Sequence, residues 1–451
     1  MHRKQEEIHM NYDNEPRQDI LCIDVKSFFA SVEAVERNLN PLDARICVVS
    51  RPNRQGGLVL ASSPLVKAEY GVKTGTRVFD IPQKADIQIV EPRMTLYLKK
   101  NLEILNIFRQ FVSDQDLHPY SIDESFLNVS HSHRLFGTTY QIARTLQDKI
   151  WQEMGLVATV GIGDNPLLAK LALDHQAKKK AISRYIAHWR YQDVPHTVWK
   201  IEDLADFWGI GSRTKAKLNK LGIETVYDLA QADLAKLKDR FGIIGQQLFF
   251  HAHGIDRTQL SDHYTPQSSS YSRNQILQKD YTDPYEIKVV IREMGEENAM
   301  RLRKHQQTAG LVKLTIGYSR DILAAGFSHQ VTIEATDSSK KLQDYLVHIF
   351  DQYYDYQPVR VVNVTFGQIA PKQGVQLSLF EDNQDQVREE KKMAVIDHIK
   401  SRFGNTAILP ANSLLDGSMA VYRDSLVGGH RAGDNPKKNR KWRSLAYQLF
   451  K

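Results

Sequence analysis

The sequence predicts a multidomain protein of mixed α/β and α+β class, and three observations support this prediction. A chain of 451 residues is too long for a single hydrophobic core, so three or four domains are expected. Strand-like and helix-like segments alternate over residues 19–198, which is typical of a mixed α/β domain. Residues 199–257 have a helical, glycine-punctuated pattern, whereas residues 273–370 return to alternating strands and helices, as in a small α+β domain.

The composition is that of an ordinary globular protein. Sixty Lys and Arg against 53 Asp and Glu give a net charge of +7, which permits a polyanionic partner without demonstrating one. Cys22 and Cys47 are the only cysteines and form no CxxC motif, so a reducing, cytoplasmic location is expected. No apolar stretch reaches the length of about 18 residues that a membrane span needs. Residues 1–18 are polar and are expected to form a loose extension rather than a signal peptide.

The apolar periodicity sets the expected elements of residues 19–198. The expected strands are short apolar runs at 20–23, 45–50, 58–61 and 157–162. The expected helices have apolar residues at helical spacing, at 27–38, 65–70 and 165–180, with longer amphipathic stretches at 95–113 and 133–155. Gly71 is expected to end the helix at 65–70.

The remaining residues divide into four parts. Two glycine-bearing turns, at 209–211 and 242–245, punctuate the helical residues 199–257. Residues 258–272 are polar and Ser-rich, which indicates a linker. In residues 273–370 we expect helices at 285–305 and 340–354 and strands at 311–318, 330–334 and 359–366. Residues 371–451 are expected to form a separate C-terminal region.

Two apolar, β-prone runs end on acidic residues. Leu21-Cys22-Ile23 precedes Asp24, and Tyr120-Ser121-Ile122 precedes Asp123 and Glu124. Carboxylates at the ends of buried strands need partners or a cation. Three hard oxygen donors, with the backbone carbonyl of Val25 as a further one, are the ligand type that Mg²⁺ prefers. The pattern therefore favours a magnesium site.

A second interpretation of the same residues is helix capping. Ser121 to Glu124 also satisfies the Ser-x-x-Glu capping box, and Asp24 is placed to cap the helix expected after it.

At these residues the chain resembles the Y-family of translesion DNA polymerases, the DinB/UmuC superfamily, and the resemblance extends over most of its length. The family pattern Asp-x-x-x-Phe-Phe/Tyr-Ala-x-Val-Glu stands here at 24–33, and Ser-x-Asp-Glu stands at 121–124. The resemblance implies a right-hand polymerase with palm and fingers over 19–198, a helix-hairpin-helix thumb over 199–257 and a little finger over 273–370. It also implies two Mg²⁺ ions, for which Mn²⁺ can substitute, held by Asp24, Val25, Asp123 and Glu124.

The same resemblance indicates a nucleotide pocket. Phe28 and Phe29 are expected to line it, with Phe29 as the steric gate that excludes ribonucleotides; without the motif, Phe29 would be taken as a helix core residue. The family places Tyr-x-x-Arg (or Lys for the Arg) shortly before a Phe/Leu-Gly-Val-Lys segment, but Leu65 and Ala68 occupy those positions here. We expect Lys67 to serve instead. Lys178 best fits the phosphate-binding lysine, although a solvated basic helix end is the alternative.

Two further segments point to macromolecular partners. The turn at 209–211 resembles a helix-hairpin-helix element, so Gly209, Gly211, Arg213 and Lys215 are expected to contact a DNA phosphate, with helix-packing glycines as the alternative. Residues 376–380 resemble the bacterial sliding-clamp peptide, with its residues Gln376, Leu377, Leu379 and Phe380. The make-up of the region after it is similar to the UmuC-like branch of Gram-positive bacteria and plasmids.

The resemblance thus implies template-directed DNA synthesis with low-fidelity bypass of damaged bases in DNA repair and the SOS response. The expected partners are primer-template DNA, deoxynucleoside triphosphates, the sliding clamp and SOS accessory proteins, with no membrane. One alternative is a catalytically weak DNA- and clamp-binding accessory protein, which Leu65 and Ala68 favour. Another is a nucleotidyl cyclase, which would have no use for the thumb and clamp segments.

Overall fold

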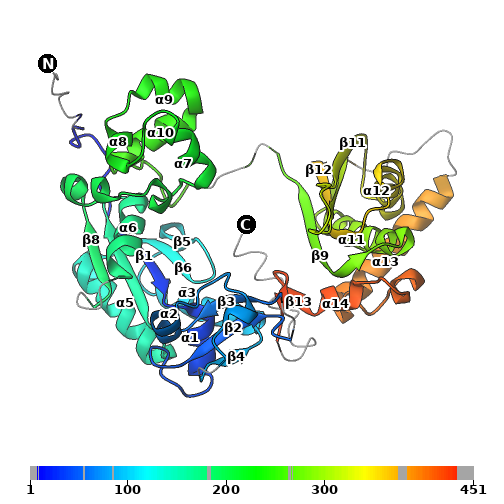
Figure 1. The fold of residues 1–451 in the computed structure, drawn as a ribbon, viewed down its shortest axis with the longest axis horizontal. Helices are drawn as coiled ribbons and strands as arrows, with labels where there is room; N and C mark the ends of the chain where they lie inside the picture. The colour runs from blue at the N-terminus through cyan, green and yellow to red at the C-terminus, as the bar shows by residue number, and fades with distance from the viewer. Residues whose placement is uncertain are drawn as a thin grey trace. The chain divides into compact units, whose positions relative to one another are not determined.

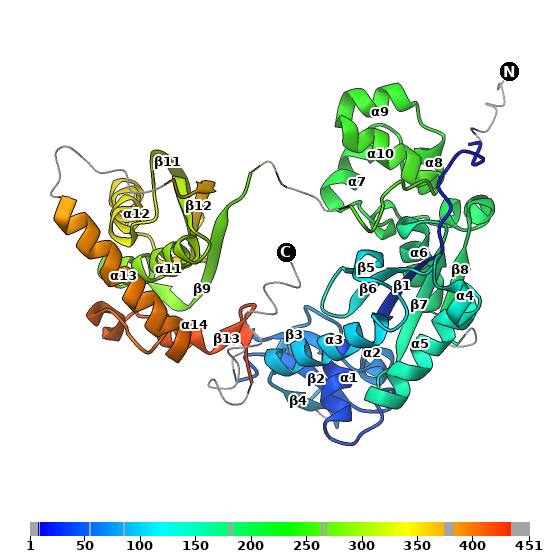
Figure 2. The ribbon, with the colours of Figure 1, turned by 180° about the vertical axis from the view of Figure 1, so that it is seen from behind.

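The computed structural model describes residues 8, 10–53, 56–83, 86–179, 184–262, 266, 268–373 and 383–433 (Figures 1 and 2). The described residues fall into two compact units, one before and one after residue 263. None of the helices among the described residues of either unit has the length and apolar character that a membrane crossing requires.

The first unit is built on a five-stranded sheet of order β5-β6-β1-β7-β8. Its strands are β1 (Ile20–Val25), β5 (Leu117–Pro119), β6 (Glu124–Asn128), β7 (Ala158–Gly163) and β8 (Ile186–Trp189). The central strand β1 pairs antiparallel with both β6 and β7. It is buried along most of its length, so the sheet places the middle of β1 in the core and its carboxyl end at the site described below.

The same part of the chain holds five helical segments: α1 (Phe28–Val35), α3 (Met94–Phe108), α4 (His133–Phe136), α5 (Thr139–Met154) and α6 (Pro166–Ala172). Of these, α5 and α6 pack on the strands of this sheet. A capping box between Thr138 and Gln141 begins α5, and Gly155 ends it with a φ of 65°. The helix expected at 165–180 is α-helical only to Ala172. It continues as a π-helical turn, η3 (Leu173–Ala177).

A smaller three-stranded sheet of order β3-β2-β4 follows β1 and α1 in the chain. It contains β2 (Ile46–Ser50), β3 (Leu58–Ser62) and β4 (Gln88–Val90), with α2 (Pro64–Tyr70) beside it. As expected, Gly71 ends α2, because its φ of 66° suits a residue without a Cβ.

The helical part of the first unit holds α7 (Ser212–Asn219), α8 (Val226–Ala230), α9 (Leu234–Phe241) and α10 (Ile243–Ala252). Short 3₁₀ turns connect the sheet to it at Tyr191–His196, Val198–Lys200 and Leu204–Asp206. Two more lie earlier in the chain, at Val78–Asp80 and Asp114–Asp116. One hydrophobic cluster runs continuously from α6 and β8 into these helices, so the two parts share a core.

The expectation that residues 1–18 form a loose extension is wrong for residues 10–18. The ring of Tyr12 stacks on that of Tyr191 at 4.8 Å, and its hydroxyl donates to the carbonyl of His253 at 3.0 Å. Glu15 forms an ion pair with Arg257. These contacts tie the start of the chain to the end of the helical part.

The second unit is a four-stranded antiparallel sheet of order β11-β10-β12-β9 with two helices against it. The strands are β9 (Tyr271–Tyr281), β10 (Gln307–Tyr318), β11 (Phe327–Thr336) and β12 (Val359–Pro371), and the helices are α11 (Pro284–Lys304) and α12 (Ser339–Tyr353). Apart from β9, each of these elements matches one expected from the periodicity to within a residue or lengthens it.

Residues 383–433 belong to the second unit, so the expectation of a separate region after residue 370 is wrong for these residues. They form α13 (Asn383–Phe403), a 3₁₀ turn (Ala411–Leu414), α14 (Ala420–Asp424) and the hairpin β13 (Leu426–Val427) and β14 (His430–Arg431). Met419 enters the core of the unit, and Arg423 is buried against Glu293 and Glu297 of α11 at 2.7 and 2.8 Å.

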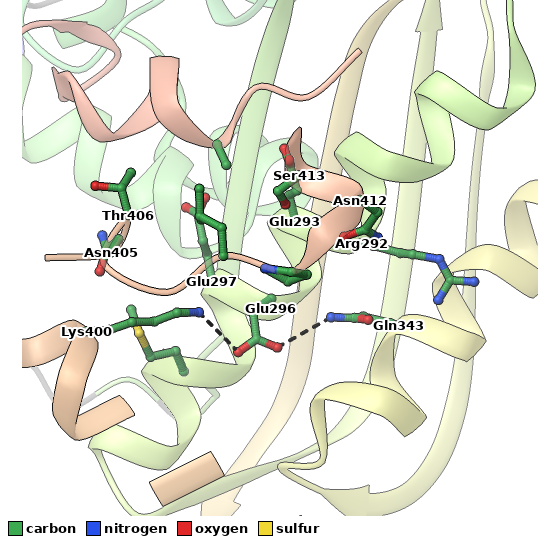
Figure 3. A pocket seen from close by; sticks show the side chains of 14 residues that line it. Arg292, Glu293, Glu296, Glu297, Gln343, Lys400, Asn405, Thr406, Asn412 and Ser413 are labelled. Atoms are coloured by element: carbon green, nitrogen blue, oxygen red, sulfur yellow. Dashed lines mark hydrogen bonds and ion pairs between the residues drawn. The ribbon is translucent and has the colours of Figure 1, made fainter. Parts of the chain in front are cut away.

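A small cavity of about 90 Å³ remains where this segment covers α11. In Figure 3 the side chains of Lys400 and Gln343 approach the Glu296 carboxylate from its two sides. Lys400 lies 3.8 Å and Gln343 3.4 Å from this carboxylate. Basic groups of residues 383–433 thus pair with the acidic residues of the cavity, so the segment is held to α11 by charge pairs as well as by apolar packing.

Candidate active site

The acidic residues meet at one end of the first sheet because β1 and β6 are neighbours. Asp24 lies directly opposite Glu124 in the antiparallel pair. The backbone N–H of Val25 donates to the carbonyl of Asp123 at 3.0 Å, which continues the pairing past the strand end. Asp24 therefore lies inside β1 rather than after it. Glu124 begins β6 and Asp123 directly precedes it, so the acidic pair lies at the start of a strand and not at the end of one as expected.

The turn before β6 is ordered by Ser121. Its hydroxyl accepts from the backbone N–H of Glu124 at 3.0 Å and lies 2.7 Å from the Asp123 carboxylate. Asn101 of α3 donates to the carbonyl of Ile122 at 2.8 Å and fixes the turn from behind. No helix follows Glu124, so the interpretation of Ser121 to Glu124 as a helical capping box is wrong. Asp24 caps no helix either, since the residue at the start of α1 is Ser27.

An alternating chain of charges joins the two strands through α6 and η3. Lys170 lies 2.7 Å from Glu124 and 3.0 Å from Asp174. Lys178 lies 2.9 Å from Asp174 and 3.1 Å from Asp24. The three members from the helical segment are four residues apart, so they follow one face of it. Glu124 is further held by the thiol of Cys22 at 3.2 Å.

The charges in this chain shift the pKa values of its members. Burial raises the pKa of Asp24 to about 7, and repulsion from Asp123 and Glu124 adds to the rise although Lys178 opposes it. Burial lowers the pKa of Lys178, but Asp24 and Asp174 raise it by more, so the lysine remains charged. Asp24 is consequently a carboxylate that a further cation would stabilise in its ionised form.

A cavity of about 560 Å³ opens beside Asp24. It is lined by the two carboxylates Asp24 and Asp123, by three lysines and by residues of α1, β3 and α2; the members used below are Val25, Lys26, Phe28, Phe29, Lys67 and Lys178. The ammonium group of Lys67 donates to the hydroxyl of Ser27, another lining residue, at 2.9 Å. Burial lowers the pKa of Lys67.

Most of the predicted site residues therefore come together, and one does not reach the cavity. Glu124 is adjacent in the pairing, but its carboxylate is engaged by Lys170 and Cys22 and does not line the cavity. Among the described residues, no three His, Cys, Asp or Glu side chains converge as a finished metal site. The donor chemistry of Asp24 and Asp123 nevertheless suits a hard cation, because both are carboxylates on one cavity.

The first glycine turn of the helical part is open to a ligand. Gly209 has a φ of 97° and Gly211 begins α7, and a Cβ at either position would meet no atom within 4 Å. Arg213 is exposed, whereas Lys215 pairs with Asp203 at 2.8 Å. Trp208, next to this turn, donates to the Tyr120 hydroxyl at 3.2 Å and so links it to the acidic turn. The residues Gln376, Leu377, Leu379 and Phe380 lie outside the described residues.

Two residues of the site that the sequence analysis did not single out are Lys170 and Asp174. The fold alone brings Glu124 to Lys170, whereas the four-residue spacing of Lys170, Asp174 and Lys178 on one helical run is a signal in the sequence.

Comparisons with known proteins agree with this geometry. Residues 23–174 match the impB/mucB/samB family, residues 268–379 match the C-terminal domain of that family, and residues 205–256 match a DNA polymerase-iota thumb domain. A solved Y-family DNA polymerase chimera (Dbh-Dpo4-Dbh) shares the fold at a TM-score of 0.62 and 21% identity, covering 78% of this chain and 99% of its own.

Two curated relatives from Bacillus subtilis (strain 168) extend over nearly the whole chain. The first, "Putative UV-damage repair protein UvrX", is 42% identical over 94% of this chain and 100% of its own length. The second, "DNA polymerase IV 2", is 35% identical over 91% of this chain and 98% of its own. The chain therefore belongs to the impB/mucB/samB family, the Y-family of DNA polymerases, and its enzyme class is a DNA-directed DNA polymerase.

Proposed function

We propose that this chain extends a primer on a DNA template by nucleotidyl transfer at two divalent cations and bypasses damaged template bases. The observation that carries the proposal is the cavity that Asp24 and Asp123 share with Phe29, Lys67 and Lys178. It combines donors for a cation, cations for a polyphosphate and an aromatic wall for a sugar. Relatives named for UV-damage repair and for DNA polymerase IV favour the same function.

In this proposal the metal ions are Mg²⁺, with Mn²⁺ able to substitute, held by Asp24, Asp123, Glu124 and the carbonyl of Val25. Bound there, they supply the charge that activates the primer hydroxyl and neutralises the leaving pyrophosphate. Glu124 must turn from Lys170 to join them, which Asp174 makes feasible because it remains as a partner for the lysine.

The lysines of the cavity hold the polyphosphate. Lys178 and Lys67 line the cavity from different elements, Lys178 from the C-terminal end of η3 and Lys67 from α2. The position of Lys67 in the cavity lining supports the expectation that it serves in place of the missing Tyr-x-x-Arg pair. Leu65 does not line the cavity, and Ala68 carries no charge. Phe28 and Phe29 both line the cavity, but Phe28 is almost fully buried and Phe29 is half-buried, so Phe29 is the ring that meets the sugar.

The other partners are proposed from their segments. Gly209, Gly211, Arg213 and Lys215 would hold a phosphate of the primer-template duplex through backbone N–H groups and positive charge. Residues 376–380 would bind a bacterial sliding clamp. Action within an SOS response, with accessory proteins and in the cytoplasm, belongs to the same proposal.

Primer extension tests the proposal. Wild-type protein with Mg²⁺ and all four deoxynucleoside triphosphates should extend a primed template past an abasic site, and Asp123→Asn/Glu124→Gln should abolish synthesis while retaining DNA binding. Asp148→Asn/Glu153→Gln on α5 is the matched control, because both carboxylates are about half exposed and pair with neighbours on the same helix. Binding of DNA without any extension by the wild type would instead establish the accessory protein that Leu65 and Ala68 favour.

A further inference from the structure

The ring expected to exclude ribonucleotides is stacked on a second aromatic residue. Phe29 of α1 and Tyr97 of α3 lie with ring centroids 4.4 Å apart and planes within 15° of parallel. Tyr97 is fully buried, whereas Phe29 is half-buried and lines the cavity. One face of the Phe29 ring therefore rests on the Tyr97 ring of α3.

The hydroxyl of Tyr97 is anchored by a buried carboxylate. It donates to Glu33 Oε1 at 2.8 Å, and Glu33 is itself fully buried. Arg93 holds both oxygens of Glu33, at 2.9 and 2.7 Å, and Arg37 pairs with the same carboxylate. Although burial raises the pKa of Glu33, the hydrogen bonds from Arg93, Arg37 and Tyr97 lower it by more, so the anchor stays ionised.

The residues that hold Tyr97 come from the same two helices, α1 and α3, as the stacked rings themselves. Glu33 lies four residues after Phe29 on α1, on the same face of that helix, and Arg93 lies four residues before Tyr97 at the start of α3. Tyr97 thus contacts α1 twice, with its ring against Phe29 and with its hydroxyl against Glu33. A shift of the Tyr97 ring would break a buried, charge-assisted hydrogen bond.

From this geometry we infer that Tyr97, held by Glu33 and Arg93, is a positioning residue that fixes the Phe29 ring and thereby sets the discrimination between deoxyribose and ribose. The inference rests on the proposed function. Ribose differs from deoxyribose by a single oxygen atom. The Phe29 ring can exclude ribose only if the ring stays in place, because a small displacement of the ring would relieve the clash with that oxygen. The stack removes that freedom on the side away from the cavity.

The test is single-nucleotide incorporation opposite template guanine with dCTP and with rCTP, and the readout is the ratio of the two kcat/KM values. Tyr97→Leu removes the stack and should lower the ratio at least about tenfold, towards the value for Phe29→Ala. Tyr97→Phe keeps the ring and should lower it by no more than about threefold. Tyr140→Leu, at an exposed tyrosine of α5, is the control and should leave the ratio unchanged.

The ratio separates positioning from a general loss of structure. A partly unfolded preparation loses activity toward both nucleotides equally, so its ratio does not move. Tyr97→Leu/Phe29→Ala should give the ratio of Phe29→Ala alone, because the stack matters only while the gate is present.

An unchanged ratio in Tyr97→Leu beside a lowered ratio in Phe29→Ala overturns the inference and leaves the proposed gate intact. An unchanged ratio in Phe29→Ala overturns the assignment of the gate, and the inference with it. Absence of synthesis with dCTP in the wild type overturns the proposed function itself.

Discussion

The ammonium group of Lys170 lies 2.7 Å from the carboxylate of Glu124, and both side chains are more than nine-tenths buried. The pair connects α6 to β6, and neither side chain lines the cavity. A buried ion pair adds little stability compared with an apolar pair, but removal of one partner leaves the other charge without compensation. Glu124 therefore depends on Lys170 for the compensation of its buried charge.

Lys170→Met should lower the free energy of unfolding by about 3 kcal/mol, because Glu124 loses its buried counter-charge. Urea unfolding followed by tryptophan fluorescence measures this, since Trp151, Trp189, Trp199 and Trp208 all lie in the first unit. Lys170→Met/Glu124→Gln should recover most of the loss. Equal losses in the single and double variants would show that the pair is not the cause.

The stability of the metal-free protein should fall as the pH rises from about 4 to about 7. The pKa of Asp24 is raised from 3.8 to about 7 in the folded state, so the folded state binds the extra proton in that window and releases it above it. One pKa unit corresponds to about 1.4 kcal/mol, so the loss is on the order of 3 kcal/mol. Urea unfolding in EDTA across the window tests this, and Asp24→Asn should flatten the dependence.

Mg²⁺ should reverse that loss. A cation binds the ionised carboxylate, so added Mg²⁺ should stabilise the wild type more above about pH 7 than below about pH 5. Asp24→Asn is expected to show no such difference. A Mg²⁺ effect of the same size in both proteins would place the cation elsewhere.

Lys67→Met should raise KM for a deoxynucleoside triphosphate about tenfold with a smaller change in kcat, because the lysine is proposed to hold the polyphosphate. Steady-state single-nucleotide incorporation measures both constants. Lys99→Met is the matched control, since Lys99 is half exposed on α3 and does not line the cavity. A loss confined to kcat would argue against polyphosphate binding by Lys67.

Arg423→Met should loosen residues 383–433 from the second unit. The guanidinium is buried against Glu293 and Glu297, so its removal should cost about 3 kcal/mol, or roughly a hundredfold in the protection of α14 amides from hydrogen exchange. Arg388→Met, at an exposed residue of α13, should change nothing. Undiminished protection of α14 in Arg423→Met would show that apolar packing alone holds the segment.

The sequence predicted the strands and helices well where apolar periodicity is strong, as in β7 and α11. It could not separate a helix cap from the turn at Ser121, because the serine hydroxyl accepts from a backbone N–H three residues later in both structures. The packing of residues 10–18 could not be predicted from their polar sequence either, because Tyr12 contacts Tyr191 and His253, which lie far along the chain.

The candidate site was also predictable only in part, because local motifs mark some of its residues and long-range contacts determine the others. Asp24, Asp123 and Phe29 belong to short motifs that the family resemblance identifies. Lys170 and Tyr97 act through contacts between distant segments, and a sequence pattern carries such contacts only weakly. Glu33 did give a signal, because an acidic residue within the apolar run of α1 needs a buried partner.

Single-nucleotide incorporation on four primed templates that differ only in the first unpaired base tests the central claim most directly. Each template is offered each deoxynucleoside triphosphate separately with Mg²⁺. We predict that the preferred nucleotide follows the template base and that Asp123→Asn removes incorporation on all four templates. Incorporation that ignores the template base, or that persists in Asp123→Asn, would contradict template-directed synthesis at this cavity.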